Sequence, residues 1–132
     1  MREAIVGTPE QIERSLREAK EGGVAGVNVL SSALLFALRG QIIKLSTELG
    51  LPAMYQWPET ADEGGLIAYG PSLPAFRQVT TLVDRILKGA KPERIPIEQP
   101  TRFSLVVNLK AANTLGLTIP PLTLLRADRA IE

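Results

Sequence analysis

The sequence predicts an α/β protein, a three-layer α/β/α sandwich built on a mostly parallel sheet. Short apolar runs rich in β-branched residues alternate with segments in which apolar residues recur at helical spacing. The helical segments are about ten residues or longer, enough to cross over between parallel strands. Right-handed crossovers would place helices on both faces of the sheet. A length of 132 residues suits one such domain with a hydrophobic core.

The first elements are predicted to be an edge strand and a helix. Residues 4–6 form a short apolar run that suits an edge strand. Thr8 is the expected N-cap of the helix, with Pro9 in its first position and Gln11 placed to complete a capping box. Gly22 and the glycine after it should end this helix.

Two further strands and a long helix are expected next. Val24–Leu30 is mostly apolar and rich in valine, as is typical of an internal strand of a parallel sheet. A helix should cover about Leu34–Leu49, with Gly40 weakening it by roughly 1 kcal/mol relative to alanine. Residues 52–55 form a third strand, and residues 57–65 a turn-rich loop.

The second half of the chain is predicted as an extended segment, a helix, a crossing segment, a strand and two closing helices. Ser72 and Asn108 are the expected N-caps of the first and second of these helices. We place the elements at 66–69, 72–88, 90–101, 103–107, 108–116, and from Pro120 toward Ile131.

Composition argues against several kinds of chemistry. The net charge of +1 gives no reason to expect nucleic acid as a partner. The chain has no histidine and no cysteine, which removes the imidazole base, the thiolate nucleophile and the usual zinc ligands. No phosphate loop of the GxxxxGK[ST] kind occurs. We therefore expect no cofactor and no metal, and an enzyme is the weakest hypothesis.

Ser31 and Ser32 are the first candidate ligand-binding residues. In open parallel sheets, ligands bind beyond the carboxyl ends of the strands, and both serines follow a predicted strand. Their hydroxyls could bond a polar group of a solute. The alternative is that one serine only caps the following helix.

Gln56 and Trp57 are a second candidate pair, after the next predicted strand. Tyr55 and Trp57 offer flat apolar surface for a ring or an aliphatic solute, and Gln56 can both donate and accept hydrogen bonds. The alternative is that the two aromatic residues belong to the core or anchor the loop. In the same loop, Glu59, Asp62 and Glu63 could do acid–base work or hold a cation, but a solvated acidic loop is the favoured interpretation.

The stretch from Leu51 to Pro121 carries the most specific pattern in the chain. It contains LPAMYQW, EGGLIAYGPSL, VDRILKGAKP and IPIEQPTRFSLVVNLKAANTLGLTIPP in that order, and the chain closes with LLRADRAIE. These segments resemble the C-terminal part of the substrate-binding proteins of ABC transporters, a periplasmic-binding-protein type I-like family associated with aromatic amino acids and other small organic solutes. The resemblance implies a lobe of the Rossmann or flavodoxin-like kind.

The resemblance implies a solute-binding function without catalysis. Proteins of this family close two lobes around a small organic solute, an amino acid or an aromatic acid among them, and the closed form docks on a membrane permease. Residues 1–132 would be one partial domain that resembles the C-terminal lobe. Family members are periplasmic, but no export signal is visible after Met1, so the chain would be cytoplasmic if it is the complete natural product.

The resemblance also adds two residues to the candidate site. Tyr69 and Gly70 match a hinge of the family, where Tyr69 would face the cleft, although a plain strand-to-helix turn is the alternative. Many relatives carry an acidic residue in a sequence like LSDP where this chain has Ser31 and Ser32. Recognition of an ammonium group is therefore not implied.

A homodimer is expected on physical grounds. By resemblance, the helix at residues 72–88 packs on the other lobe, and the sheet of this chain would lack a central strand. Burying each large apolar side chain contributes about 1.5–3 kcal/mol, so an exposed stripe of them favours a second copy that covers it, with an exchange of helices as one arrangement. The alternative function is a truncated relative that no longer transports and acts as a dimeric scaffold or ligand sensor.

Overall fold

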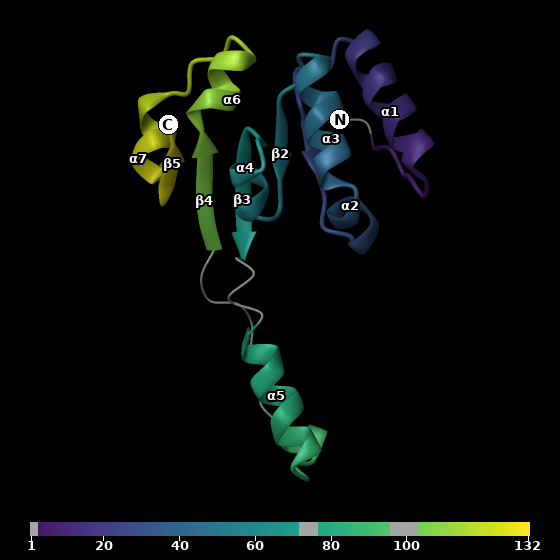
Figure 1. Cartoon of the computed structure of the whole chain (residues 1–132), viewed down its shortest axis with the longest axis vertical. Helices are drawn as coiled ribbons and strands as arrows, with labels where there is room; N and C mark the ends of the chain where they lie inside the picture. The colour runs from purple at the N-terminus through teal and green to yellow at the C-terminus, as the bar shows by residue number, and fades with distance from the viewer. Residues whose placement is uncertain (1–2, 72–76, 96–102) are drawn as a thin grey trace.

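The computed structural model describes residues 3–71, 77–95 and 103–132 (Figure 1). Within these ranges, one sheet contains five strands, in the spatial order β1-β2-β3-β4-β5. β1, β2 and β3 run parallel, β4 runs antiparallel to β3, and β5 runs parallel to β4. The predicted α/β fold with a mostly parallel sheet is confirmed. The strands are β1 (Val27–Val29), β2 (Ala53–Tyr55), β3 (Ile67–Pro71), β4 (Phe103–Asn108) and β5 (Arg129–Ile131).

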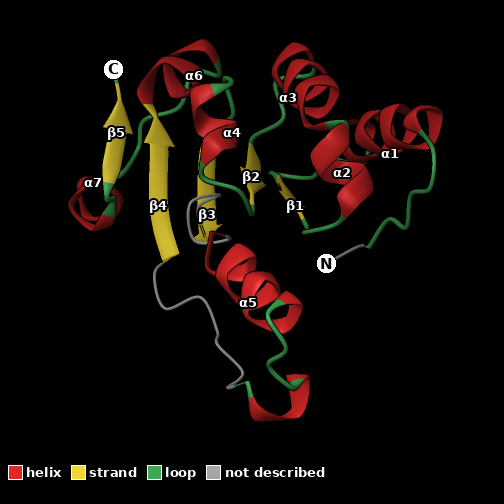
Figure 2. Cartoon of the chain, turned by 60° about the horizontal axis from the view of Figure 1, so that its bottom comes forward, coloured by secondary structure: helices red, strands yellow, loops and turns green. Residues whose placement is uncertain are grey.

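The helices gather around the sheet, except for α5, which lies apart from it (Figure 2). α1, α3 and α4 contribute side chains to the main hydrophobic core. The described helices are α1 (Pro9–Glu21), α2 (Ala33–Ala37), α3 (Arg39–Glu48), α4 (Glu59–Asp62), α5 (Arg77–Leu87), α6 (Leu109–Thr114) and α7 (Pro121–Arg126), with a 3-10 turn, η2 (Pro92–Arg94).

One face of the sheet holds the core. Side chains alternate between the two faces along a strand, so every second residue of each strand points into this core. Tyr55, at the end of β2, is only 1% exposed within it. The strands contribute Val29, Ala53, Tyr55, Ala68 and Val106, which pack against Ile12 and Leu16 of α1, Ile42, Ile43 and Leu45 of α3, and Ala61 of α4.

The opposite face is only partly covered. We call its uncovered part, over β1 to β3, the open face, and define it by Asn28, Met54, Ile67 and Tyr69. The strand register places Asn28 beside Met54, and Met54 beside Ile67. Asn28 and Tyr69 are exposed, while Met54 and Ile67 are half-buried. Among the described residues, the third layer of the sandwich is therefore incomplete over these strands.

The predicted helix caps at Thr8 and Asn108 are confirmed. The Thr8 hydroxyl accepts a hydrogen bond from the Gln11 N–H at 3.3 Å, and Gln11 Oε1 accepts from the Gly7 N–H at 2.7 Å. Asn108 Oδ1 accepts from the Ala111 N–H at 2.9 Å. Because Asn108 Nδ2 also donates to a carbonyl of α4 at 2.8 Å, this buried cap ties β4 to α4.

The edge strand predicted at residues 4–6 is wrong. No strand is assigned there, although Val6 is half-buried and packs against the core. An apolar run needs a neighbouring strand to form a ladder, and this run has none in the described sheet. The strand predicted at Val24–Leu30 is present but shorter, as β1.

The helix predicted over Leu34–Leu49 is two helices, α2 and α3. The break lies at Leu38, which has φ −98° and ψ 10°. Arg39 Nη1 donates to the Phe36 carbonyl at 2.9 Å and so occupies an acceptor near the end of α2. The helix therefore bends where a side chain competes for its backbone hydrogen bonds.

The last predicted helix does not run to Ile131. It ends as α7 at Arg126, and the chain continues as β5. Asp128 explains the change, because its N–H donates to the Leu105 carbonyl at 2.9 Å and its Oδ2 accepts from the Leu105 N–H at 2.8 Å. This pair of bonds returns the chain to β4. The expected gap in the sheet is also wrong, since each described strand is paired with the next in sequence.

The acidic loop between β2 and β3 is more structured than expected. It contains the one-turn helix α4 and carboxylates that form ion pairs. Glu63 pairs with Arg39, and Asp62 pairs with Arg129. Asp62 and Glu63 are exposed, as the interpretation of a solvated acidic loop expects, and their ion pairs in addition fasten the loop to α3 and to β5.

α5 forms an arm that extends away from the sheet (Figure 1). Leu87 is 81% exposed, and Val83 and Ile86 are also exposed. Gly89 follows the helix with φ 96°, as expected for a helix stop. Ser72 and the rest of the predicted start of this helix lie outside the described residues, as does the second half of the predicted crossing segment, residues 96–101.

The Asp62–Arg129 pair should make stability depend on pH. Arg129 donates to both Asp62 oxygens at 2.6 Å, and these hydrogen bonds hold the pKa of Asp62 below its ordinary value of 3.8. A carboxyl group whose pKa is lower in the folded state stabilises the fold at pH values above its unfolded-state pKa. This contribution to stability is lost as the pH falls through the folded-state pKa.

We expect Asp62→Asn to lower the thermal unfolding midpoint at pH 7, with the difference from the parent closing as pH falls from about 4 toward 2. Circular dichroism melts across this range measure it. A difference that stays constant down to pH 2 would contradict the assignment.

Candidate functional site

The candidate residues lie along one edge of the sheet. The carboxyl ends of β1, β2 and β3 meet there because these strands are parallel, and β4 begins there because it is antiparallel to β3. Phe103, the first residue of β4, pairs with Pro71, the last residue of β3. We call this the carboxyl edge. It is where ligands of open α/β sheets bind.

Ser31 and Ser32 follow β1 at the carboxyl edge, and both are exposed. Ser32 is the N-cap of α2, and its hydroxyl accepts from the Leu35 N–H at 3.1 Å. This bond uses one acceptor site of the Ser32 hydroxyl, which can still donate its proton. The structure thus places both serines where a solute could reach them, and contact with a solute stays a prediction.

Gln56 follows β2, and its side chain reaches across to β1. Gln56 Nε2 donates to Asn28 Oδ1 at 3.2 Å, which orients the two carboxamides toward each other on the open face. Sequence analysis did not select Asn28. The sequence does contain a signal for Asn28, because its amide side chain interrupts an otherwise apolar run at residues 27–30.

Trp57 is placed differently from the other candidates. It is 8% exposed, and its ring packs edge-on against Phe36 with the ring centroids 5.0 Å apart. In this conformation Trp57 offers little ring surface to a solute. Tyr55 is also buried, and burial raises the pKa of its phenol to about 12. The neighbouring Ser46 hydroxyl acts in the opposite direction on this pKa, and burial is the larger effect.

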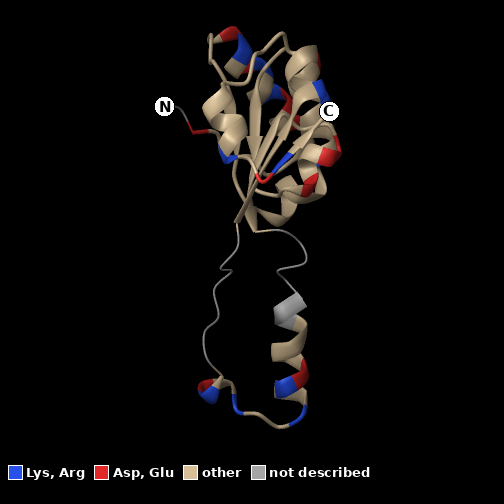
Figure 3. Ribbon diagram, turned by 90° about the vertical axis from the view of Figure 1, so that its left-hand side faces the viewer, with Lys and Arg blue, Asp and Glu red and all other residues tan. Residues whose placement is uncertain are grey.

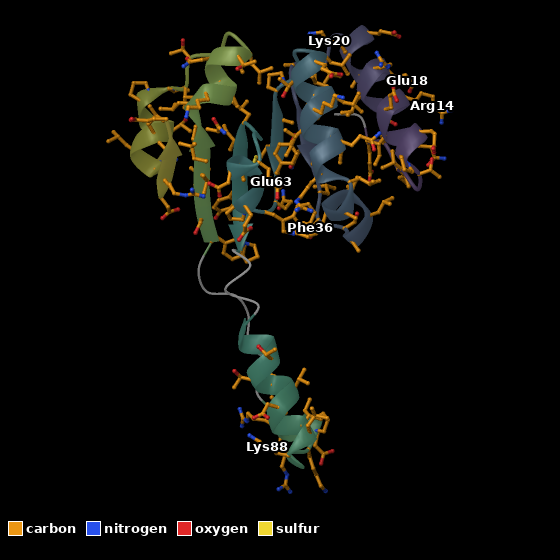
Figure 4. The ribbon with its side chains drawn as sticks, in the orientation of Figure 1. Arg14, Glu18, Lys20, Phe36, Glu63 and Lys88 are labelled. Carbon is orange, nitrogen blue, oxygen red and sulfur yellow. The ribbon has the colours of Figure 1, made fainter. Side chains whose placement is uncertain are left out.

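Phe36 and Glu63 are joined through Arg39. The Arg39 guanidinium lies 4.4 Å above the Phe36 ring centroid, and its Nε is 2.8 Å from Glu63 Oε2. Figure 4 shows Phe36 at the end of the body that faces the arm, with Glu63 above it. These contacts fasten the α2–α3 break to the loop after α4. Because both charged groups are partly exposed, we expect the Arg39–Glu63 pair to contribute about 1 kcal/mol or less to the free energy of unfolding.

Tyr69 and Gly70 lie near the C-terminal end of β3. Tyr69 is 45% exposed, and its ring centroid is 5.7 Å from that of Phe103, with 30° between the ring planes. Gly70 is required by close packing, and the hinge that the resemblance implies stays a prediction. A Cβ atom on Gly70 would lie 1.8 Å from the Gln56 carbonyl oxygen, so only glycine allows this approach of β3 to β2.

Charged side chains gather elsewhere. Figure 3 marks the positions of many Lys, Arg, Asp and Glu residues along the helices and toward the tip of the arm. A shallow depression on the outer surface of α1 is lined only by charged side chains, and several of these pair along the helix, as Arg17 does with Glu13 at 2.7 Å. It therefore forms a solvated helix surface and not a second candidate site. Its lining residues are Glu10, Glu13, Arg14, Arg17, Glu18 and Glu21.

Over the three described ranges, no group of three or more acidic residues could hold a metal ion. No helix in those ranges is long and apolar enough to cross a membrane.

The fold and the carboxyl edge define the class of protein. The chain has an open α/β sheet, and the edge where such sheets bind ligands carries hydroxyl, carboxamide and aromatic groups. Residues 2–131 match the family described as ABC transporter substrate binding protein, and the chain belongs to that family. This is a family of binding proteins and not of enzymes. A comparison with curated proteins found no match.

Three solved structures show the same fold. A conserved domain protein from Vibrio cholerae O1 biovar El Tor is 20% identical with TM-score 0.81, and 92% of this chain covers 41% of it. An ABC domain from Streptococcus pneumoniae in complex with L-Trp is 22% identical with TM-score 0.82. The match covers 96% of this chain and 43% of that structure. A ligand-free, open structure of a substrate-binding protein with adhesive properties from Clostridium difficile is 16% identical with TM-score 0.61. The match covers 96% of this chain and 42% of that structure. The chain therefore spans less than half the length of each.

Gly70→Ala should destabilise the protein. The added methyl group would meet a backbone carbonyl that cannot move as a side chain can, and overpacking of this kind costs about 1–3 kcal/mol or more. Gly40→Ala is the matched control, because Gly40 lies within α3 with no atom near its Cβ position. We expect that change to stabilise the protein by about 0.5–1 kcal/mol. Urea unfolding measures both, and equal stability of Gly70→Ala and the parent would contradict the close approach.

Proposed function

We propose that this chain binds a small organic solute for an ABC-type import system, and that it does so without chemistry. The family match over residues 2–131 is the observation that carries this proposal. The carboxyl edge supports it, because the predicted candidates from three strands are brought to the same edge of one sheet. The solute would be held there by hydrogen bonds and by apolar contact.

The chain would act as the C-terminal lobe of a two-lobed clamp. It covers 41–43% of the length of the three similar structures, which leaves room in such proteins for a second lobe. In this proposal, residues 1–132 supply one side of a cleft, and the arm reaches toward the body that supplies the other side. The helix predicted at residues 72–88, of which α5 is the described part, would pack on that body.

The proposed contacts combine polar and apolar groups. Hydroxyls and a carboxamide would bond the polar end of the solute, and an aromatic ring would cover its apolar part. An amino acid or an aromatic acid fits this combination, and the Streptococcus pneumoniae neighbour in complex with L-Trp supports it. The proposed ligand-binding residues are Ser31, Ser32, Gln56, Trp57, Tyr69 and Gly70.

The import role implies a permease as partner and a location outside the cytoplasm. Proteins of this family are typically extracytoplasmic. We propose the periplasm, with the solute-loaded clamp delivering its cargo to a membrane permease.

A dimeric scaffold or ligand sensor is the second candidate function. The exposed apolar side chains of α5 favour it, because Val83, Ile86 and Leu87 lie on an arm that stands away from its own sheet. A second copy could bury them, and each buried side chain would contribute about 1.5–3 kcal/mol. An exchange of arms between two copies gives a homodimer of this kind.

Gln56→Ala tests solute binding at the carboxyl edge. We expect the 132-residue chain to bind members of an amino-acid and aromatic-acid panel in calorimetry, and Gln56→Ala to weaken binding about 2- to 10-fold by loss of one hydrogen bond. Asn113→Ala is the matched control, since this exposed carboxamide lies on α6, which follows β4 at the opposite edge of the sheet. Equal weakening by both variants would refute the assignment of the site.

Leu87→Asp tests the homodimer. We expect the parent chain to sediment as a dimer at micromolar concentration, and Leu87→Asp to shift it toward monomer, because a carboxylate would replace a buried apolar group. Leu125→Asp is the control, since Leu125 is equally exposed but lies on α7. A parent chain that sediments as a monomer would exclude the exchange of arms.

A further inference from the structure

Two apolar surfaces of this chain are left uncovered by the described residues. One is the open face of the sheet. The other is a row of exposed side chains along α5, Val83, Ile86 and Leu87, which we call the arm stripe. Apolar surface of this kind adds to stability only when another body removes water from it.

The arm stripe lies along one side of α5. Val83, Ile86 and Leu87 recur at i, i+3 and i+4, the spacing of residues that share one side of a helix. The charged residues fall on the other side, and two of them, Asp84 and Lys88, pair with each other at 2.7 Å. A helix of this kind docks by laying its apolar side on an uncharged surface while its charged side stays in water.

The open face is an uncharged surface, because none of its residues is acidic or basic. Two more exposed apolar side chains extend it. Leu30 follows Asn28 by two residues, so continued alternation puts it on the same side of the sheet. Phe103 precedes Leu105 by two residues, and Leu105 pairs with Tyr69. The polarity of the open face therefore matches that of the arm stripe.

The open face also has the dimensions of one helix. Strands about 4.8 Å apart give β1 to β3 a width of about 10 Å, close to the diameter of a helix with its side chains. The 11 residues of α5 make a helix about 16 Å long, and the 5 residues of β3 span about the same length. A single helix as long as α5 would complete the third layer over these strands.

The direction of the arm favours a second copy as the source of that helix. α5 lies apart from its own sheet (Figure 2), and the arm continues beyond the carboxyl edge along the direction of the strands (Figure 1). A two-fold axis that crosses the strands at this edge turns each arm back over the sheet of the other copy. The contact then occurs twice, and it covers twelve exposed apolar side chains, six from each copy. The six are Leu30, Tyr69, Val83, Ile86, Leu87 and Phe103.

We propose that the open face is the docking site for α5 of a second copy, so that each chain supplies the missing helix layer of the other. This rests on the dimer given above as the second candidate function, and it goes beyond an exchange of arms because it assigns the surface that receives each arm. The arm stripe of one copy lies on Met54 and Ile67 of the other. Because the open face reaches the carboxyl edge at Tyr69, the partner's arm also borders the candidate site.

Cross-linking between differently labelled chains tests this assignment. The sequence has no cysteine, so an introduced cysteine reports on its own position alone. A Leu87→Cys chain is mixed at micromolar concentration with an isotope-labelled Met54→Cys chain, and a short bis-maleimide is added. We expect mass spectrometry to find the link between the two chains in about 10-fold higher yield than with Leu125→Cys in place of Leu87→Cys. Leu125→Cys is the matched control, since Leu125 is equally exposed but lies on α7.

Oxidation of Met54 gives a second measurement, which uses the parent chain and no variant. The sequence has only two methionines, so peptide mapping assigns each sulfoxide to its residue. In excess hydrogen peroxide, the oxidation rate of Met54 should fall several-fold as the chain concentration rises from nanomolar to micromolar, because the partner's arm covers the thioether. Free methionine added to the sample is the reference and should oxidise at a constant rate.

The outcomes separate this inference from the proposed functions. A dimer in which the cross-links join two Leu87→Cys arms, or in which Met54 oxidises at the same rate as in dilute solution, overturns the open face as the docking site and leaves the dimer standing. A double variant, Leu87→Cys with Met54→Cys, that links within one chain at nanomolar concentration shows the arm folding onto its own sheet, and it also overturns the inference.

A parent chain that stays monomeric at micromolar concentration overturns both this inference and the dimeric candidate function. The arm and the open face would then be surfaces for a different body, such as a second lobe. Solute binding is tested separately by the calorimetry of Gln56→Ala, so its failure is distinguishable from each of these results.

Discussion

The close approach of β3 to β2 at Gly70 is the constraint on which the candidate site depends. The Gly70 backbone lies where a side chain would strike the Gln56 carbonyl, so the two strands end side by side. β4 then starts beside the end of β3 because it is antiparallel. The residues that end β2 and β3 and the residue that starts β4 are thereby held at the same edge of the sheet. A wider spacing of these strands would separate Gln56 from Tyr69.

Much of the fold could be predicted from local patterns. The caps at Thr8 and Asn108 were predictable because a side-chain oxygen and a nearby N–H are enough to form them. The missing strand at residues 4–6 and the added strand β5 were not, because strand formation depends on a distant partner. The break at Leu38 lies where Arg39 bonds the Phe36 carbonyl and also pairs with Glu63, a contact between residues far apart in sequence. Local periodicity contains no information on such contacts.

The candidate site was predictable in position but not in detail. The rule that ligands bind at carboxyl ends of parallel strands placed Ser31, Gln56 and Tyr69 at one edge, as the structure does. It could not show that Trp57 turns into the packing against Phe36. Phe103 was overlooked because it begins a strand, and only an antiparallel partner brings the start of a strand to that edge.

The carboxyl edge and the arm both leave apolar side chains exposed to water. Exposed rings at the carboxyl edge and exposed aliphatic side chains on α5 do little for the stability of the chain alone, since apolar side chains stabilise a protein only when water is excluded from them. One lobe can remove water from one side of a bound solute, and the second side must be covered by another body for high affinity. The same closure would cover both surfaces at once. In a two-lobed clamp that body is the other lobe, and in an exchanged dimer it is the second copy. If the chain binds a solute as proposed, the strength of binding depends in either case on what packs against the arm, and the affinity of this chain alone should be far below that of the closed assembly.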